Sequence, residues 1–310
     1  MTKDLFPKMS KRTLGLLAFS MTSILWGTTF VVLKNVSQEF SPSFLLSIRY
    51  AFALIAIFPI AYPTLKKLDK KTWLYGFLMG FTMWASNITQ TAGIYLGTTP
   101  GKSAFITTSY CIIVPFLYWA FTRIKPEKTK VIASILCLIG VGIISLSGDL
   151  SIKTGDFLTL VTGVALGTNM VLVAIFCHRK DGNLLIFLQV FFVWLLSVIT
   201  CVATNAYPES ISISSVLGTA YLGVFATTGA FIFQVYGFKH SNATSGAIIL
   251  ATHAPIAVLL SIIFYGEVLN AKTIIGFIVI FIAVILSEIT FRKPEVNKTK
   301  NILKSVEKEK

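Results

Sequence analysis

The most regular feature of the chain is a succession of long apolar runs separated by short polar segments. Ten such runs, most of them close to 20 residues long, can be marked along the sequence. A helix needs about 20 apolar residues to cross a bilayer, whereas a strand of a membrane barrel needs about 10 with alternating polarity. The pattern therefore predicts transmembrane helices at about 13–33, 44–63, 73–96, 103–122, 131–147, 156–177, 184–204, 216–236, 243–264 and 273–290.

The composition agrees with a membrane protein. Of the 310 residues, 55% are apolar and 13% are charged, and the mean hydropathy is +0.77. A soluble fold could not cover so much apolar surface, and a disordered chain would be far more polar. The runs and their connections use almost the whole chain, so no separate soluble domain is expected. The predicted fold class is an all-α integral membrane protein with ten transmembrane helices.

The positive charges give these predicted helices an orientation. The net charge of +14 could point to nucleic acid, but the cations lie in short connections between apolar runs, so no nucleic-acid partner is expected. If the N-terminus is cytoplasmic, the inside segments hold 22 Lys and Arg, and the outside connections hold only Lys34, Lys102, Lys153 and Lys272. Because cytoplasmic connections are enriched in Lys and Arg, we expect a multi-pass protein of the cell membrane with both termini in the cytoplasm.

A second regularity is an internal repeat whose two halves match mainly at one offset, with drifts of one or two positions in places. The matches in this register are Gly27 with Gly167, Arg49 with Gln189, Pro115 with Pro255, and Glu127 with Glu267. We divide the chain into 1–150 with helices 1–5, 151–290 with helices 6–10, and a disordered cytoplasmic tail over 291–310. Five is an odd number, so the second half enters the membrane in the opposite direction. Inverted repeats are a transporter architecture, although a fusion without that function stays open.

Several local patterns resemble one transporter family. They are the run SILWGTTFVVLK around Trp26 and Gly27, Pro42 followed by Arg49, a proline inside helices 4 and 9, Gly266-Glu267 after helix 9, and the run AYLGVFATTGAFIFQVYGF in helix 8. With these patterns the chain resembles the EamA-type branch of the drug/metabolite transporter superfamily over about residues 13–290. The resemblance implies a ten-helix carrier with a central cavity lined mainly by helices 1, 3, 4, 6, 8 and 9, and it favours export. It gives no role to Glu127, because Lys125-Pro126-Glu127 departs from the Gly-Glu pattern of the second half.

Two ionisable side chains inside the predicted helices are candidate substrate-binding groups. Arg49 lies about six residues into helix 2, where it could meet a substrate carboxylate or extend to the outer headgroups. His253 lies near the middle of helix 9, where it could line a cavity or bond a neighbouring helix. Pro255 follows it two residues later, and a proline frees a backbone carbonyl and kinks a helix. Pro115 and Pro255 are therefore candidate hinges.

Neutral side chains complete the predicted binding set, which adds Trp26, Asn87, Gln90, Tyr110, Asn169 and Gln234. Asn87 and Gln90 are three residues apart and share one helix face. Taken singly, each polar group could instead hold helices together, and Trp26 could simply pack. Together they place uncharged hydrogen-bonding groups on most of the expected lining helices. With the resemblance, this favours an amino acid or a derivative as substrate, while drug-like compounds, sugars and nucleosides stay open.

The sequence suggests neither a cofactor site nor a catalytic group. The four cysteines lie in or at the ends of apolar runs without a CxxC spacing, so no metal site or disulfide is expected. The segment 97–103 resembles a phosphate loop but has three residues between its glycines where four are needed, so no nucleotide is expected.

These observations predict a secondary transporter that works by alternating access and is not an enzyme. A non-transporting receptor or assembly subunit is the first alternative, and an intramembrane enzyme is the second. The expected partners are a small-molecule substrate and the lipid bilayer, with the protein a monomer or a homodimer.

Overall fold

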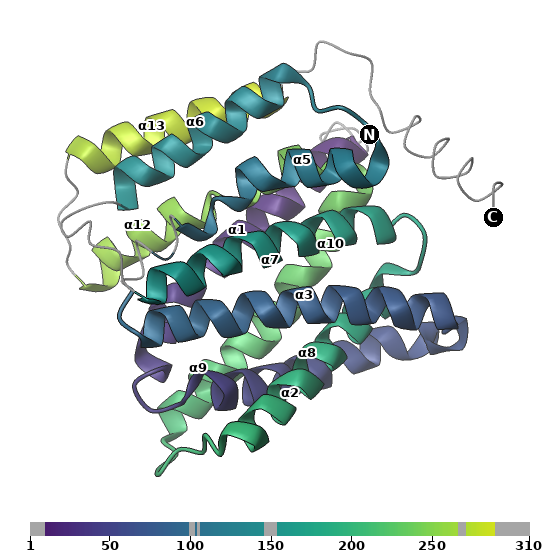
Figure 1. Ribbon diagram of the computed structural model, residues 1–310, viewed down its shortest axis with the longest axis vertical. Coiled ribbons are helices and arrows are strands. Elements are labelled where there is room, and N and C mark those ends of the chain that lie inside the picture. Colours follow the sequence, from purple (N-terminus) through teal and green to yellow (C-terminus); the bar gives the residue numbers. More distant parts are fainter. Residues whose placement is uncertain (1–9, 99–102, 104–105, 146–153, 266–270, 289–310) are drawn as a thin grey trace, which may run out of the picture.

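The regular structure of the described residues is entirely helical (Figure 1). The computed structural model describes residues 10–98, 103, 106–145, 154–265 and 271–288. Its elements are α1 (Lys11–Val36), α2 (Pro42–Ala61), the 3-10 helix η1 (Tyr62–Lys67), α3 (Lys70–Tyr95), α5 (Tyr110–Thr122), α6 (Lys128–Ser145), α7 (Thr154–Phe176), α8 (Gly182–Thr204), α9 (Ile213–Gly223), the π-helix η2 (Val224–Gly229), α10 (Ala230–His240), α11 (Ala243–Leu250), α12 (His253–Tyr265) and α13 (Ala271–Glu288).

The all-helical prediction is confirmed for this part of the chain, whereas the number of spans is only partly supported. Six described segments are long and apolar enough to cross a membrane: Lys11–Val36, Pro42–Lys67, Thr154–Phe176, Gly182–Thr204, Ile213–His240 and Ala243–Leu260. The apolar segments Tyr110–Thr122 and Ile274–Ser287 are shorter. Helix α3 has 26 residues, but polar side chains such as Asn87 and Gln90 lower its hydropathy.

The outside of the helix bundle is apolar. Ile55, Ile263 and Phe281 are 70%, 72% and 66% exposed, and many other large apolar side chains are exposed with them. A soluble monomer rarely exposes extended apolar surface, because water opposes it. This surface suits lipid, and with the long apolar helices it identifies a multi-pass membrane protein.

Short polar residues set where most of the long helices begin. Ser10, Ser41, Asp69, Asp181 and Ser212 each accept a hydrogen bond from a backbone N–H in the first turn of α1, α2, α3, α8 and α9. Such caps satisfy donors that have no partner inside the helix. These caps therefore fix the residues at which the five helices begin.

Each main contact between two helices has an equivalent contact in which the two halves of the chain have swapped roles. Helix α3 packs on α7, and the corresponding pair is α1 with α10. In the same way α3 packs on α8 as α2 packs on α9, and α5 packs on α7 as α12 packs on α1. Two pairs are their own counterparts, α2 with α8 and α6 with α13, and they lie along opposite edges of the bundle (Figure 1).

Two of these contacts depend on a glycine that meets a backbone carbonyl of the facing helix. A Cβ on Gly80 of α3 would lie 3.1 Å from the carbonyl oxygen of Gln189 in α8. A Cβ on Gly223 of α9 would collide with the carbonyl oxygen of Arg49 in α2 and lie 2.7 Å from the Cβ of Phe52. Both helix pairs therefore approach closely enough that no side chain fits between them.

The candidate hinge prolines lie just after interruptions of the helices. Helices α11 and α12 are separated at Ala251 and Thr252, and Pro255 is the third residue of α12. Because proline has no N–H and its ring crowds the carbonyl four residues earlier, it disfavours a regular helix at Ala251. Pro115 lies inside α5, which begins directly after a turn at Thr108 and Ser109. Whether these sites move as hinges stays a prediction.

Candidate functional site

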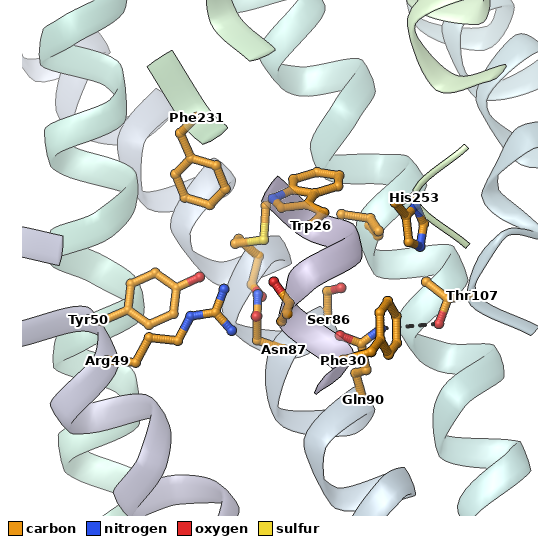
Figure 2. Close-up of a pocket in the computed structure, with 13 residues that line it drawn as sticks. Trp26, Phe30, Arg49, Tyr50, Ser86, Asn87, Gln90, Thr107, Phe231 and His253 are labelled. Carbon is orange, nitrogen blue, oxygen red and sulfur yellow. Dashed lines mark hydrogen bonds between the residues drawn. The ribbon is translucent and has the colours of Figure 1, made fainter. Parts of the chain in front are cut away.

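A cavity in the middle of the bundle collects side chains from α1, α2, α3, α7, α10 and α12 (Figure 2). Its empty volume is about 510 Å³, counting the space that opens to its surroundings. This size is in the range of small-molecule sites, which are about 300–1,000 Å³. Its lining consists of Trp26, Thr29, Phe30, Arg49, Tyr50, Met83, Ser86, Asn87, Gln90, Thr107, Leu166, Phe231 and His253.

Arg49 is the charged group of this lining, and it is buried. Its side chain is 5% exposed, and its Nε donates a hydrogen bond of 2.9 Å to the hydroxyl of Thr227. Its Cζ lies 5.7 Å from the centroid of the Tyr50 ring. No described Asp or Glu forms an ion pair with it. The guanidinium thus presents its two terminal nitrogens to the cavity instead of extending to the bilayer surface (Figure 2).

Aromatic rings form the opposite part of the wall. The ring of Phe30 is stacked on that of His253 at 5.8 Å, and the indole of Trp26 meets His253 edge-on at 6.3 Å. Nδ1 of His253 lies 2.7 Å from the carbonyl oxygen of Leu250, so it carries the proton and donates. The helix interruption before His253 leaves its ring facing the cavity, between α1 and α12 (Figure 2).

Amides and hydroxyls of α3 supply neutral polar groups between these two walls. The side-chain amide of Asn87 donates to the carbonyl of Met83 at 2.8 Å, and that of Gln90 donates to the hydroxyl of Thr107 at 3.4 Å. Ser86 lies on the same face of the helix. The cavity therefore offers a cation on one side, aromatic surface on the other and neutral hydrogen-bonding groups between them.

The structure brings five of the eight candidates named from sequence to this cavity: Trp26, Arg49, Asn87, Gln90 and His253. The other three lie elsewhere. Asn169 donates its amide to the carbonyl of Met79 at 2.8 Å, and so joins α7 to α3. Tyr110 is fully buried, with its ring 6.4 Å from that of His253. Gln234 is 1% exposed, and neither atom of its amide has a hydrogen-bond partner among the described residues.

Sequence reasoning missed several lining residues, notably Phe30, Tyr50 and Phe231. Tyr50 is fully buried, and its hydroxyl has no partner among the described residues. Helical spacing could have found Phe30, which lies one turn after Trp26 on the same face. For Tyr50 the spacing offers no such signal, because it is adjacent to Arg49 and a regular helix turns adjacent residues about 100° apart.

One end of the bundle is held by two reciprocal ion pairs. Lys67 pairs with Asp181 at 3.0 Å, and Lys180 pairs with Asp69 at 2.6 Å. Both acids also cap a helix, α3 for Asp69 and α8 for Asp181. The hydrogen bond from Lys180 lowers the pKa of Asp69, and the hydrogen bonds from Thr72 add to this effect. Burial raises the pKa of Asp181, but the hydrogen bonds from Lys67 and from the backbone N–H groups of α8 outweigh it, so this pKa is lowered as well. We call this the ion-pair end.

The opposite end is joined differently. The carboxylate of Glu39, between α1 and α2, accepts hydrogen bonds from Ser212 and Ser215 at the start of α9, and these bonds lower its pKa. A hollow lined by Asn35, Glu39 and Glu209 lies at the same end. We call this the Glu39 end. The central cavity lies in the middle of the bundle and towards the Glu39 end, since Arg49 lies near the start of α2 and Gln90 near the end of α3.

Metal-binding groups do not gather in the part of the chain that the structure describes. No group of three or more His, Cys, Asp or Glu is placed to hold an ion there. The four cysteines are free and buried.

Comparison with known proteins agrees with this architecture. A transporter of Archaeoglobus fulgidus, named "Uncharacterized transporter", is 27% identical over 89% of this chain and 86% of its own length. The Bacillus subtilis protein named "Uncharacterized transporter YrdR" is 24% identical over 93% of this chain and 95% of its own. A crystal structure covering 89% of this chain and 96% of its own superposes with a TM-score of 0.73 at 12% identity, which shows the same fold. The EamA-like transporter family model matches residues 13–146 and again 153–289, so the chain is a membrane transporter that belongs to the EamA-like transporter family.

Proposed function

We propose that the protein is a secondary transporter that moves a small carboxylate-bearing metabolite, an amino acid or a derivative, by alternating access. The observation that carries this substrate class is the buried Arg49, which faces the cavity without an acidic partner among the described residues. A buried unpaired charge is costly, and an anionic ligand removes that cost. The family resemblance favours export.

The other side of the cavity favours an amphipathic molecule. Trp26, Phe30 and His253 present ring faces and edges that can hold an apolar or aromatic side chain. Asn87 and Gln90 offer amide groups for a polar substituent such as an amino group. A carboxylate at one end, a polar group beside it and an apolar side chain match an amino acid.

Alternating access is supported by the relation between the two halves. We propose ten transmembrane helices arranged as two inverted five-helix repeats, 1–150 and 151–290. Two separate family matches support this proposal, and so do the helix pairs that exchange when the halves are exchanged. Gly80 against Gln189 and Gly223 against Arg49 add a residue-level match, because Arg49 and Gln189 are partners in the internal repeat. Two similar halves placed upside down give two states of similar energy that open to opposite faces.

The function is tested with purified protein in liposomes. Exchange of a ¹⁴C-labelled L-amino-acid mixture across the vesicle membrane should be saturable, and it should be inhibited by an excess of the same unlabelled mixture. Thermal stabilisation by the mixture without any flux would indicate a receptor and contradict the transporter proposal. Absence of both flux and stabilisation would exclude amino acids as the substrate class.

The orientation in the membrane gives a separate prediction. Cysteines introduced at positions 102 and 272 should react with an impermeant thiol reagent in intact cells, since both positions lie in predicted outside connections. Cysteines at 70 and 128 should react only after permeabilisation. A background without the four native cysteines removes labelling at other sites. Labelling at 102 and 128 from the same side would be incompatible with the ten-helix arrangement.

The ion-pair end should control how readily the protein opens towards that side. Replacing both Asp69 and Asp181 by Asn removes the two charge pairs, while Asn keeps the helix caps. Exposed ion pairs are weak individually because water and salt screen them, so the equilibrium should shift only a few-fold towards the state open at the ion-pair end. The measurement is the rate of thiol labelling of a cysteine placed at Val235, beside the start of α8.

Two wild-type measurements check the cause of that shift. Salt screens exposed charges, so raising the ionic strength should increase labelling at position 235 in the wild type but not in the double variant. The pKa of both acids is lowered in the folded protein. Their contribution to holding the ion-pair end together is therefore complete above the unfolded-state pKa of about 3.9, and it is lost as the pH falls through the lowered folded-state pKa. Labelling should therefore not change between pH 8 and pH 5 as a result of these two carboxylates.

A further inference from the structure

Gln234 is buried in α10 without the hydrogen bonds that its amide requires. It is 1% exposed, and both Nε2 and Oε1 lack a partner among the described residues. Leaving a buried amide unpaired costs free energy that an apolar side chain of the same size would not. Asn169, another buried amide in the same bundle, donates its nitrogen to Met79 and Thr82, so only its Oδ1 lacks a partner among the described residues, whereas both atoms of the Gln234 amide do. The conformation described here therefore gives no reason for an amide at position 234.

The position of Gln234 relates it to the central cavity. Phe231 lines the cavity, and Gln234 follows it three residues later on the same face of α10. Next to Gln234, Val235 packs beside Gly182 at the start of α8, which adjoins the ion pair of Asp181. Gln234 thus lies between Phe231, which lines the cavity, and the ion-pair end.

The second observation is that Gln234 is the counterpart of Gln90. Each glutamine is followed three residues later by a glycine, Gly93 in α3 and Gly237 in α10. The carbonyl of Gly93 lies against Gly155 of α7, and the carbonyl of Gly237 lies against Gly15 of α1. Gly15 and Gly155 are themselves equivalent positions of the internal repeat, because they are separated by the same number of residues as Arg49 and Gln189. The contacts therefore put Gln90 and Gln234 at equivalent places in the two halves.

The π-helix η2 accounts for the register of this match. Before η2, Gly223 corresponds to Gly80; after η2, Gln234 corresponds to Gln90. The number of residues between Gln90 and Gln234 is larger by one than the number between Gly80 and Gly223. A π-helical turn holds one residue more than an α-helical turn, so it adds this one residue without disturbing the helix on either side. Both glutamines then face the centre of the bundle from opposite halves.

From these observations we infer that Gln234 contacts the substrate when the protein is open at the ion-pair end, as Gln90 lines the cavity in the conformation described here. This inference rests on the proposed alternating access between the two inverted halves. In the other state the α10 half takes the place around the cavity that the α3 half has here, and the Gln234 amide gains hydrogen-bond partners from substrate and water. The amide that is unpaired in one state is thus used in the other.

The test is a pair of isosteric variants, Gln234→Met and Gln90→Met, in sealed vesicles of both orientations. For exchange of the ¹⁴C-labelled L-amino-acid mixture, Gln234→Met should raise the half-saturating concentration at the ion-pair face at least tenfold and leave the Glu39 face unchanged. Gln90→Met should do the reverse. Gln234→Met should also raise Tm by about 2 °C, because an unpaired amide is removed, whereas the control Asn169→Leu should lower Tm.

Each other result has a defined meaning. A fall in Tm like that of Asn169→Leu, or loss of folded Gln234→Met protein, would make Gln234 a packing residue and overturn the inference. Saturable wild-type exchange with an unchanged Gln234→Met affinity at both faces would overturn it as well, while leaving the transporter proposal intact. No saturable wild-type exchange from either face would instead contradict the proposed function itself.

Discussion

Replacing Arg49 by Met should reduce the kcat/KM of amino-acid exchange at least about 30-fold, because truncating one partner of a buried charge-assisted contact costs about 2–5 kcal/mol. Arg49→Lys keeps the charge but loses the planar fork that can hold both oxygens of a carboxylate, so it should lose about tenfold. Both are measured as initial rates of ¹⁴C-labelled exchange in proteoliposomes at low substrate concentration.

Stability and a matched variant separate binding from packing at this site. Arg49→Met should keep or raise Tm, since a buried charge without an acidic partner is removed. Thr227→Val loses only the hydrogen bond to Nε and should have a smaller effect on transport. Arg123→Met removes an exposed cation at the end of α5 and serves as the control. Normal exchange by Arg49→Met at low substrate concentration would remove the carboxylate from the proposed substrate.

The second large effect is expected at Gly223. An alanine there places its Cβ against the carbonyl oxygen of Arg49 and 2.7 Å from the Cβ of Phe52, so α2 and α9 must separate. Overpacking of this kind costs about 1–3 kcal/mol, and it moves the helix that carries Arg49. Gly223→Ala should therefore lower both Tm and the exchange rate.

A nearby glycine provides the control for this prediction. The nearest atoms to a Cβ on Gly229 are 3.7 Å away, so Gly229→Ala has room and should be neutral or stabilising. Gly80→Ala, at the equivalent contact with Gln189, should lower Tm as Gly223→Ala does. If Gly223→Ala and Gly229→Ala had equal melting temperatures, the close contact between α2 and α9 would not limit stability.

The sequence predicted the helical class, and five of its eight candidate residues line the cavity, because both depend on local composition. Polar groups inside apolar runs are expensive, so Arg49, Asn87, Gln90 and His253 could be recognised without a structure. Tyr50 could not, since an aromatic residue in a membrane helix packs equally well against lipid, whereas the helical spacing from Trp26 could have found Phe30. Asn169 looked the same as Asn87 in sequence, and only the packing of α7 on α3 separates a structural amide from a lining one.

The internal repeat was predicted at one main offset with drifts of one or two positions, but the contacts show a larger change of register in α3 and α10. One offset relates Arg49 to Gln189, whereas the contacts of α3 and α10 relate Gln90 to Gln234 at a slightly longer one. Part of this difference arises at η2, where one extra residue is held in a π-helical turn. A single extra residue inside a continuous apolar run leaves no visible change in the hydrophobic pattern. The correspondence of the two glutamines could therefore be found only from the structure.

The unequal pair of Arg49 and Gln189 has a kinetic consequence. These equivalent positions carry a cation in one half and a neutral amide in the other, so in the proposed alternating-access cycle the two half-cycles pass through electrostatically different intermediates. The ratio of forward to backward rate constants around a passive cycle is set by the concentration gradient alone. The rate of transport can therefore differ between the two directions when gradients of equal size are applied from opposite sides. The direction of net transport is still the one that the gradient dictates.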